Sequence, residues 1–145
     1  MPSAEHTVVI DRPMEEIFDF LVDGNNNDKW RGGILEISRT SDSVGAGASY
    51  RQVMRGPGGR RIDGDYRIIR YERPSRFDFE VTAGPARPTG VFELTETTPG
   101  QTTVRFALDL RPKGAMLVMT PMIRSQLRRE VGALDNVKTL LEQRS

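Results

Sequence analysis

The sequence predicts an α+β protein in which a curved seven-stranded antiparallel sheet wraps around a long C-terminal helix, with two short helices between strands 1 and 2. Strand-like runs separated by Gly, Pro and Ser fill residues 32–110, and an apolar stripe at helical spacing follows over 114–144. The links between the runs are short, so neighbouring strands are expected to be antiparallel. Residues 1–145 are expected to form a single domain.

The N-terminal segment predicts one strand followed by one helix. Residues 5–10 alternate between two faces, as a strand does. Pro13 suits the first helical position, where its missing N–H costs nothing, and Glu15 and Glu16 complement the positive end of the helix dipole. Gly24 fits the end of this helix.

Three asparagines, at positions 25–27, stand just ahead of Trp30, the only tryptophan. Asn tolerates left-handed backbone and can cap a short helix, so the segment predicts a corner that delivers Trp30 to the next strand. A calcium loop would need several carboxylates and a closing Glu, whereas only Asp23 and Asp28 are present. Asparagines that coordinate a ligand are the less favoured alternative.

The strand-like runs after Trp30 show alternation that is clean in the later part of the chain. Phe77 and Phe79 alternate with Asp78 and Glu80, which is typical of an antiparallel sheet that is covered on one face. The six runs occupy residues 32–40, 47–56, 60–72, 75–84, 89–98 and 102–110.

The C-terminal segment, from about Gly114 to Arg144, carries apolar residues every three or four positions on one face. Pro121 either kinks this helix or marks its start, with Thr120 as the cap. A helix of about 30 residues spans roughly 45 Å and can cross the concave face of the sheet. Such a helix seldom fills the space beneath it, so an internal cavity is expected.

Three stretches carry a family resemblance: "VVIDRPMEEIFDFLVDGNNNDKW", "RYERPSRFDF" and "ALDNVKTLLE". The first is a strand followed by Pro, two acids, an aromatic helix, an Asp and a Trp. This order resembles the START-like, helix-grip superfamily (SRPBCC), and in particular its polyketide cyclase/dehydrase and lipid-transport branch. The resemblance covers essentially the whole chain and implies the helix-grip fold. These motifs are structural and bring no catalytic signature, so a function taken from the family is analogy.

The alternation of side chains along the strands and the apolar stripe of the C-terminal helix together predict which residues line the cavity. For any single apolar candidate, plain core is the favoured alternative, although the core wall and the pocket wall are the same surface in this architecture. Polar groups at Tyr50, Gln52 and Tyr66 would orient a ligand in an apolar box, and methionines suit adaptable surfaces. The candidates are Trp30, Tyr50, Gln52, Met54, Tyr66, Ile68, Phe79, Phe92, Phe106, Met116, Met119, Ile123 and Leu127.

Candidates for acid/base catalysis are few: Tyr50, Tyr66 and His6. His6 is the only histidine and shares its strand face with Val8 and Ile10, where a structural role is the commoner one. The absence of cysteine excludes thiol chemistry, and a single histidine excludes multi-histidine metal centres. No metal and no cofactor are predicted.

The composition restricts the partners. The formal net charge is +1, from 21 basic and 20 acidic residues, and the basic stretches lack an aromatic stacking platform, so nucleic acid is not expected. No run approaches the roughly 20 apolar residues of a membrane span, and the N-terminus lacks a signal-peptide pattern, so a cytoplasmic protein without stable membrane anchoring is expected. The apolar segment 114–122 either packs as plain helix or forms an entrance that meets a membrane transiently. The sequence leaves the oligomeric state open, and its excess of Arg over Lys is typical of GC-rich bacteria.

Three functions are compatible with these observations. The first is binding of a small hydrophobic ligand, such as a lipid, a quinone or a polyketide-like aromatic, in the internal cavity. The second, which the resemblance implies, is a polyketide cyclase/dehydrase-like enzyme that acts on a bound aromatic or polyketide substrate. The third is an interaction or regulatory module with a collapsed cavity.

Overall fold

The computed structural model describes residues 3–84, 87–110 and 114–143. The strands are β1 (Ser3–Ile10), β2 (Ile34–Arg39), β3 (Ser49–Arg55), β4 (Arg61–Asp63), β5 (Tyr66–Glu72), β6 (Arg76–Val81), β7 (Thr89–Thr98) and β8 (Gln101–Asp109). The α-helices are α1 (Met14–Val22), α2 (Asn27–Trp30), α3 (Thr120–Gly132) and α4 (Leu134–Glu142). Short 3₁₀ turns are η1 (Gly24–Asn26), η2 (Pro57–Gly59) and η3 (Gly114–Met119).

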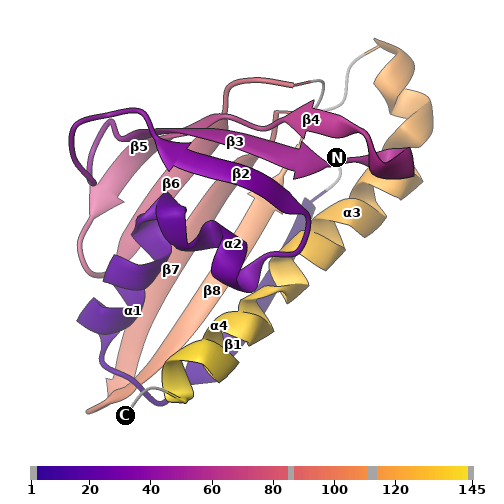
Figure 1. Ribbon diagram of the computed structural model, residues 1–145. Coiled ribbons are helices and arrows are strands. Elements are labelled where there is room, and N and C mark those ends of the chain that lie inside the picture. Colours follow the sequence, from indigo (N-terminus) through magenta and orange to yellow (C-terminus); the bar gives the residue numbers. More distant parts are fainter. Residues whose placement is uncertain (1–2, 85–86, 111–113, 144–145) are drawn as a thin grey trace.

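The strands form one antiparallel sheet in the order β1-β8-β7-β6-β5-β3-β2, with β4 paired to β3. The sheet curves around the C-terminal helix, and α1 and α2 lie between β1 and β2 in the sequence, which confirms the predicted architecture (Figure 1). The helix-grip arrangement pairs β1 with β8, so the first and the last strand of the chain lie side by side at one edge of the sheet.

The run 60–72, predicted as one strand, is two strands that are interrupted at Gly64 and Asp65. Both β4 and β5 pair with β3. At the break the amide of Gly64 donates to the Gln52 carbonyl at 2.8 Å, while the Asp65 carboxylate accepts from the amide of Gln52 at 3.2 Å. A side-chain acceptor therefore replaces a backbone acceptor, and the strand bends there.

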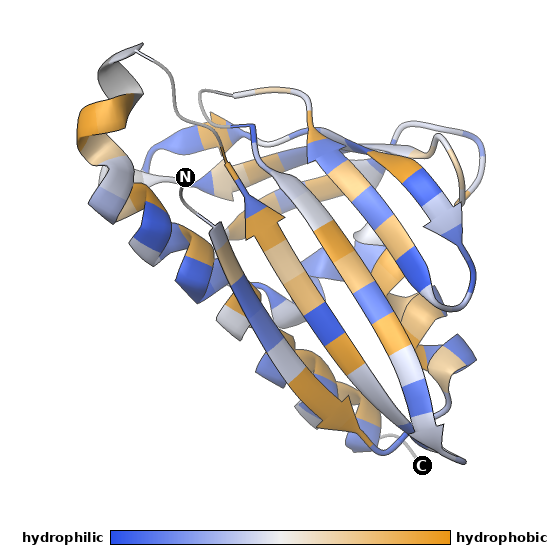
Figure 2. Cartoon of the chain, turned by 180° about the vertical axis from the view of Figure 1, so that it is seen from behind, coloured by the Kyte–Doolittle hydropathy of each residue, from blue (hydrophilic) through white to orange (hydrophobic). Residues whose placement is uncertain are grey.

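Aromatic side chains fill the middle of the concave face. Phe92 stacks on Phe106 with ring centroids 4.2 Å apart and on Phe77 at 4.7 Å. Phe79 lies beside Phe92 at 6.1 Å and is also buried. The alternation of apolar and polar residues along these strands is visible as alternating orange and blue bands in Figure 2. These aromatic side chains therefore lie on the covered face of the sheet, as the alternation along the strands predicts.

The long C-terminal helix crosses the concave side of the sheet, as predicted, but it is not continuous (Figure 1). It comprises η3, α3 and α4, with a break at Ala133. Pro121 lies in the first turn of α3, so it marks the start of the helix rather than a kink within it. Thr120 does not cap the helix in the predicted way, because its hydroxyl donates back to the Leu117 carbonyl at 2.7 Å.

An ion pair between Asp19 and Arg73 links α1 to the β5–β6 turn. We expect its contribution to the stability of the fold to depend on pH. Both guanidinium contacts measure 2.8 Å, and the hydrogen bond from Arg73 holds the pKa of Asp19 below its usual range. A carboxyl group whose pKa is depressed on folding stabilises the fold above its unfolded pKa. That contribution is lost as the pH falls through the folded pKa. The pair is half exposed, so the contribution is small.

Replacing Arg73 by Gln is therefore expected to raise the pKa of Asp19 toward its ordinary value, as followed by the carbon chemical shift of its carboxyl group in an NMR titration. Arg70→Gln is the matched control, because Arg70 pairs with Glu72 and does not contact Asp19. An Asp19 pKa that is the same in all three proteins would contradict this account.

Candidate binding cavity

A cavity of about 1180 Å³ lies between the concave face of the sheet and the C-terminal helix. Its walls are mostly apolar and come from the sheet, from α1 and from one face of α3. The apolar lining residues are Leu21, Trp30, Met54, Ile62, Phe77, Phe79, Val81, Pro88, Phe92, Leu108, Leu110, Met122, Ile123, Leu127 and Ala133. This cavity is the candidate functional site.

The asparagine segment builds the corner that the sequence predicts. The Asp23 carboxylate accepts from the amide of Asn25 at 3.1 Å, and the Asn26 side chain donates to the Phe20 carbonyl at 2.9 Å. Asn27, which the sequence analysis placed in the same corner, is instead buried and lines the cavity. Asn27 and Trp30 are three residues apart on one turn of α2, so they share a face. This three-residue spacing from Trp30 was the sequence signal that could have identified Asn27 as a lining residue.

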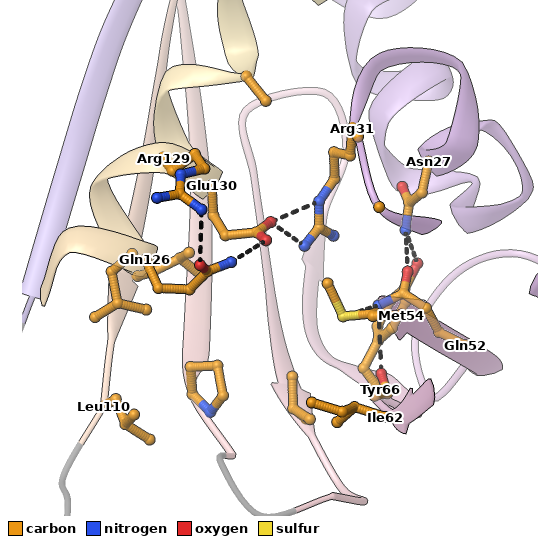
Figure 3. A pocket seen from close by; sticks show the side chains of 18 of the residues that line it. Asn27, Arg31, Gln52, Met54, Ile62, Tyr66, Leu110, Gln126, Arg129 and Glu130 are labelled. Atoms are coloured by element: carbon orange, nitrogen blue, oxygen red, sulfur yellow. Dashed lines mark hydrogen bonds and ion pairs between the residues drawn. The ribbon is translucent and has the colours of Figure 1, made fainter. Parts of the chain in front are cut away.

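Three polar side chains form a hydrogen-bonded chain in the cavity wall (Figure 3). Gln52 donates through Nε2 to the Gly64 carbonyl at 3.4 Å. Its Oε1 accepts from Nδ2 of Asn27 at 3.2 Å, and the same nitrogen donates to the Tyr66 hydroxyl oxygen at 2.9 Å. The fixed carbonyl of Gly64 therefore sets the orientation of both amide groups.

The end of this chain leaves one donor available. The Tyr66 oxygen accepts from Asn27, and within the described residues the Tyr66 hydroxyl proton has no acceptor. Burial raises the pKa of Tyr66, so the hydroxyl stays protonated at neutral pH. Tyr50 stacks on Tyr66 at 5.0 Å from behind, and burial raises its pKa as well.

A charged pair joins the end of α2 to α3 in the cavity lining. Arg31 follows α2, Glu130 lies on α3, and their side chains are only 11% and 13% exposed. Arg31 Nη2 lies 2.5 Å from Glu130 Oε2, and Glu130 Oε1 accepts from Gln126 at 3.2 Å (Figure 3). The Arg31 guanidinium also lies 5.8 Å from the centre of the Trp30 ring. The sequence analysis missed this pair, because its members are 99 positions apart and no local pattern joins them.

Trp30 forms part of the floor. Its ring meets Phe92 and Phe106 edge-on, at 6.3 and 6.0 Å. Its indole N–H is buried and has no hydrogen-bond partner among the described residues. The Asn136 side chain donates to the Trp30 carbonyl at 2.9 Å and so fixes α2 against α4.

Eight of the residues nominated from the sequence line the cavity: Trp30, Gln52, Met54, Tyr66, Phe79, Phe92, Ile123 and Leu127. Three others, Tyr50, Ile68 and Phe106, are buried in the core but do not line it. Met119 is exposed on η3 and also lies off the lining, and the side chain of Met116 lies outside the described part of the structure. His6 points away from the cavity, since its Nε2 contacts Asp135 Oδ1 at 2.8 Å on the outer side of α4.

The exposed lining residues mark where the cavity opens. They come from the loop after α2, from the end of β3, from β4 and from α3. The exposed or half-exposed side chains there include Arg55, Ile62, Asp63, Met122 and Arg129. Within residues 3–84, 87–110 and 114–143, no three His, Asp or Glu side chains are grouped so that they could hold a metal ion.

Comparison with known proteins supports the fold. The family described as polyketide cyclase / dehydrase and lipid transport matches residues 1–142. The aromatase/cyclase ZhuI from Streptomyces sp. R1128 superposes with a TM-score of 0.80 at 16% identity, covering 98% of this chain and 94% of that one. A START superfamily protein from Mycobacterium smegmatis gives 0.73 at 15%, covering 97% and 94%. The di-domain ARO/CYC BexL of the BE-7585A biosynthetic pathway gives 0.73 at 19%, covering 99% of this chain and 50% of that one. No curated protein matches significantly by sequence.

Proposed function

Because the chain belongs to the polyketide cyclase / dehydrase and lipid transport family, we propose that it binds a small, largely apolar molecule between the sheet and the C-terminal helix. The observation that carries this proposal is the cavity of about 1180 Å³ with mostly apolar walls. Ligand sites of this kind commonly enclose roughly 300–1,000 Å³, so a lipid, a quinone or a polyketide-like aromatic would fit. A cavity of this size also argues against an interaction module with a collapsed interior.

The walls and the polar groups would contribute differently to binding. Apolar surface that the ligand removes from water contributes about 25 cal/mol per Å². The chain formed by Gln52, Asn27 and Tyr66 would orient the ligand, since it ends in a hydroxyl proton that no described residue accepts. The best ligand is therefore apolar over most of its surface and carries an acceptor oxygen, such as a carbonyl, directed at Tyr66.

Native mass spectrometry of protein purified gently from its own host tests the proposal first. A discrete additional mass that is lost on denaturation would identify the ligand class by fragmentation. Trp30 provides a second signal, because it is the only tryptophan and lines the cavity. Its fluorescence should change in titrations with a quinone, a fatty acid or an aromatic polyketide. An empty mass spectrum and unchanged fluorescence for all three classes would overturn the proposal.

Tyr66→Phe is expected to weaken binding of a carbonyl-bearing ligand about fivefold to tenfold, since one hydrogen bond contributes about 1 kcal/mol. The Trp30 fluorescence titration measures this change. Tyr50→Phe is the matched control, because Tyr50 stacks on Tyr66 but does not line the cavity. Equal losses in the two variants would show that the hydroxyl of Tyr66 does not contact the ligand.

A second candidate function is catalysis of the polyketide cyclase/dehydrase type. The position of the Tyr66 hydroxyl favours it, since this group lines the cavity and its proton has no acceptor among the described residues. If Tyr66 has this role, Tyr66→Phe should lower turnover of an aromatic polyketide substrate by about 10²–10⁴ and leave most of the binding intact. Turnover that survives this substitution would exclude Tyr66 as the acid.

A further inference from the structure

An apolar patch projects beside the opening of the cavity. It consists of Leu117, Val118, Met119 and Met122, which are 59%, 84%, 43% and 59% exposed. We call these four residues the mouth patch. It lies where η3 and the start of α3 extend beyond the sheet, and Figure 2 shows this part of the chain standing clear of the strands. Met122 also lines the cavity, so the patch is continuous with the opening.

Isolated exposed apolar residues are ordinary, but a contiguous group of large ones at a cavity opening is a mark of an interaction surface. Val9 and Ile69, which are also exposed, lie singly on β1 and β5. The mouth patch therefore differs from the rest of the described surface in grouping its apolar side chains on one projecting segment.

The arginines near this end differ from those elsewhere. Arginines on the outer strands are mostly bound to carboxylates, as in Arg51–Glu36 and Arg67–Glu80. Within the described residues, several arginines have no carboxylate partner. Apart from Arg39 on β2, which donates to backbone carbonyls, they lie at the end of β3, just after η2, just before β7 and on α3. These are Arg55, Arg60, Arg87, Arg124, Arg128 and Arg129. Of the carboxylates that line the cavity, Glu130 is bound to Arg31, which leaves Asp63.

We propose that the mouth patch docks on an anionic lipid bilayer. The four apolar side chains would enter the interfacial region, while the unpaired arginines meet lipid phosphates, the arrangement of peripheral membrane-binding segments. Within the described residues, no helix is long and apolar enough to cross a membrane. Docking would place the cavity opening against the bilayer, and transfer of an apolar ligand between the two would then avoid water. That transfer rests on the proposed function, whereas the docking itself does not.

Co-sedimentation with vesicles tests the docking. One set of vesicles contains phosphatidylcholine alone, and the other contains phosphatidylcholine and phosphatidylglycerol in equal parts. The protein is expected to bind the second set more tightly, and added salt should weaken that binding because it screens the arginines. Arg124→Gln/Arg128→Gln should weaken binding about tenfold or more, from the attraction that each basic residue contributes near an anionic surface. Leu117→Ser/Val118→Ser should also weaken it, since binding scales with the apolar area that enters the interface.

Matched control variants change the same residue types elsewhere. Val9→Ser/Ile69→Ser removes exposed apolar side chains from β1 and β5, and Arg51→Gln/Arg67→Gln removes arginines that are bound to Glu36 and Glu80. Both controls should bind vesicles like the unchanged protein. The proposal is overturned if no vesicle is bound, or if the controls lose as much binding as the mouth variants. It is also overturned if sedimentation velocity shows self-association that only Leu117→Ser/Val118→Ser abolishes, since that would assign the patch to a second copy.

Discussion

Replacing Glu130 by Ala is expected to lower the free energy of unfolding by about 3 kcal/mol, because it leaves the guanidinium of Arg31 unpaired in a mostly apolar wall. Arg31 is 11% exposed, so water can compensate little of the lost contact. Gln126 loses its acceptor at the same time. Urea denaturation followed by circular dichroism measures the change, and an unchanged denaturation slope would confine it to stability.

The control for this prediction replaces both charges. Arg31→Met/Glu130→Met should recover most of the stability that Glu130→Ala loses, because neither side chain then needs a charged partner. If the double variant is as unstable as the single one, the loss comes from packing and not from an unpaired charge. Ligand titrations on the double variant also separate the roles of the pair, since they show whether binding needs a charge in this wall.

Gly24→Ala is expected to lower the free energy of unfolding by about 1–3 kcal/mol and to weaken ligand binding at least as much as Tyr66→Phe does. A Cβ atom at this position would lie 2.0 Å from the Tyr66 hydroxyl and 2.7 Å from the Tyr50 ring. Both tyrosines are buried and stacked on each other, so neither can move aside without disturbing the other. The hydrogen bond from Asn27 to Tyr66 would shift with them.

Gly32→Ala is the matched control for Gly24→Ala. Gly32 lines the cavity, its backbone conformation accepts any residue, and a Cβ there meets nothing within 4 Å. Its stability and its ligand affinity should stay close to those of the unchanged protein. If Gly24→Ala behaves like Gly32→Ala in both measurements, the close contact between Gly24 and the tyrosine pair does not position the Tyr66 hydroxyl.

Much of the fold follows from periodicity. A strand turns successive side chains to opposite faces, so the alternation around Phe77 and Phe79 predicted both the sheet and its buried face. The C-terminal stripe predicted the helix that covers that face. Periodicity did not predict the division of residues 60–72, because the break depends on how Asp65 meets the amide of Gln52, which lies on another strand.

The candidate site follows from the sequence only in part. The alternation of side chains along the strands distinguished buried from exposed positions. It could not distinguish residues of the packed core from residues that line the cavity. Tyr50 and Tyr66 are both buried, yet Tyr66 lines the cavity and Tyr50 packs behind it. Asn27 was assigned to the corner because asparagines commonly occur there, and nothing local indicated that it meets Gln52, 25 residues further on. Arg31 and Glu130 gave no local signal at all.

By itself, the sequence determined the order of the elements, the apolar face of the sheet and the absence of thiol chemistry, since each depends on neighbouring residues or on composition. The tertiary structure alone decided which buried residues line the cavity, which polar groups meet there, and where the cavity opens beside Met122 and Arg55. These features depend on distances between segments that are far apart in the chain. The curvature of the sheet and the path of the helix set those distances, and both are properties of the packed whole.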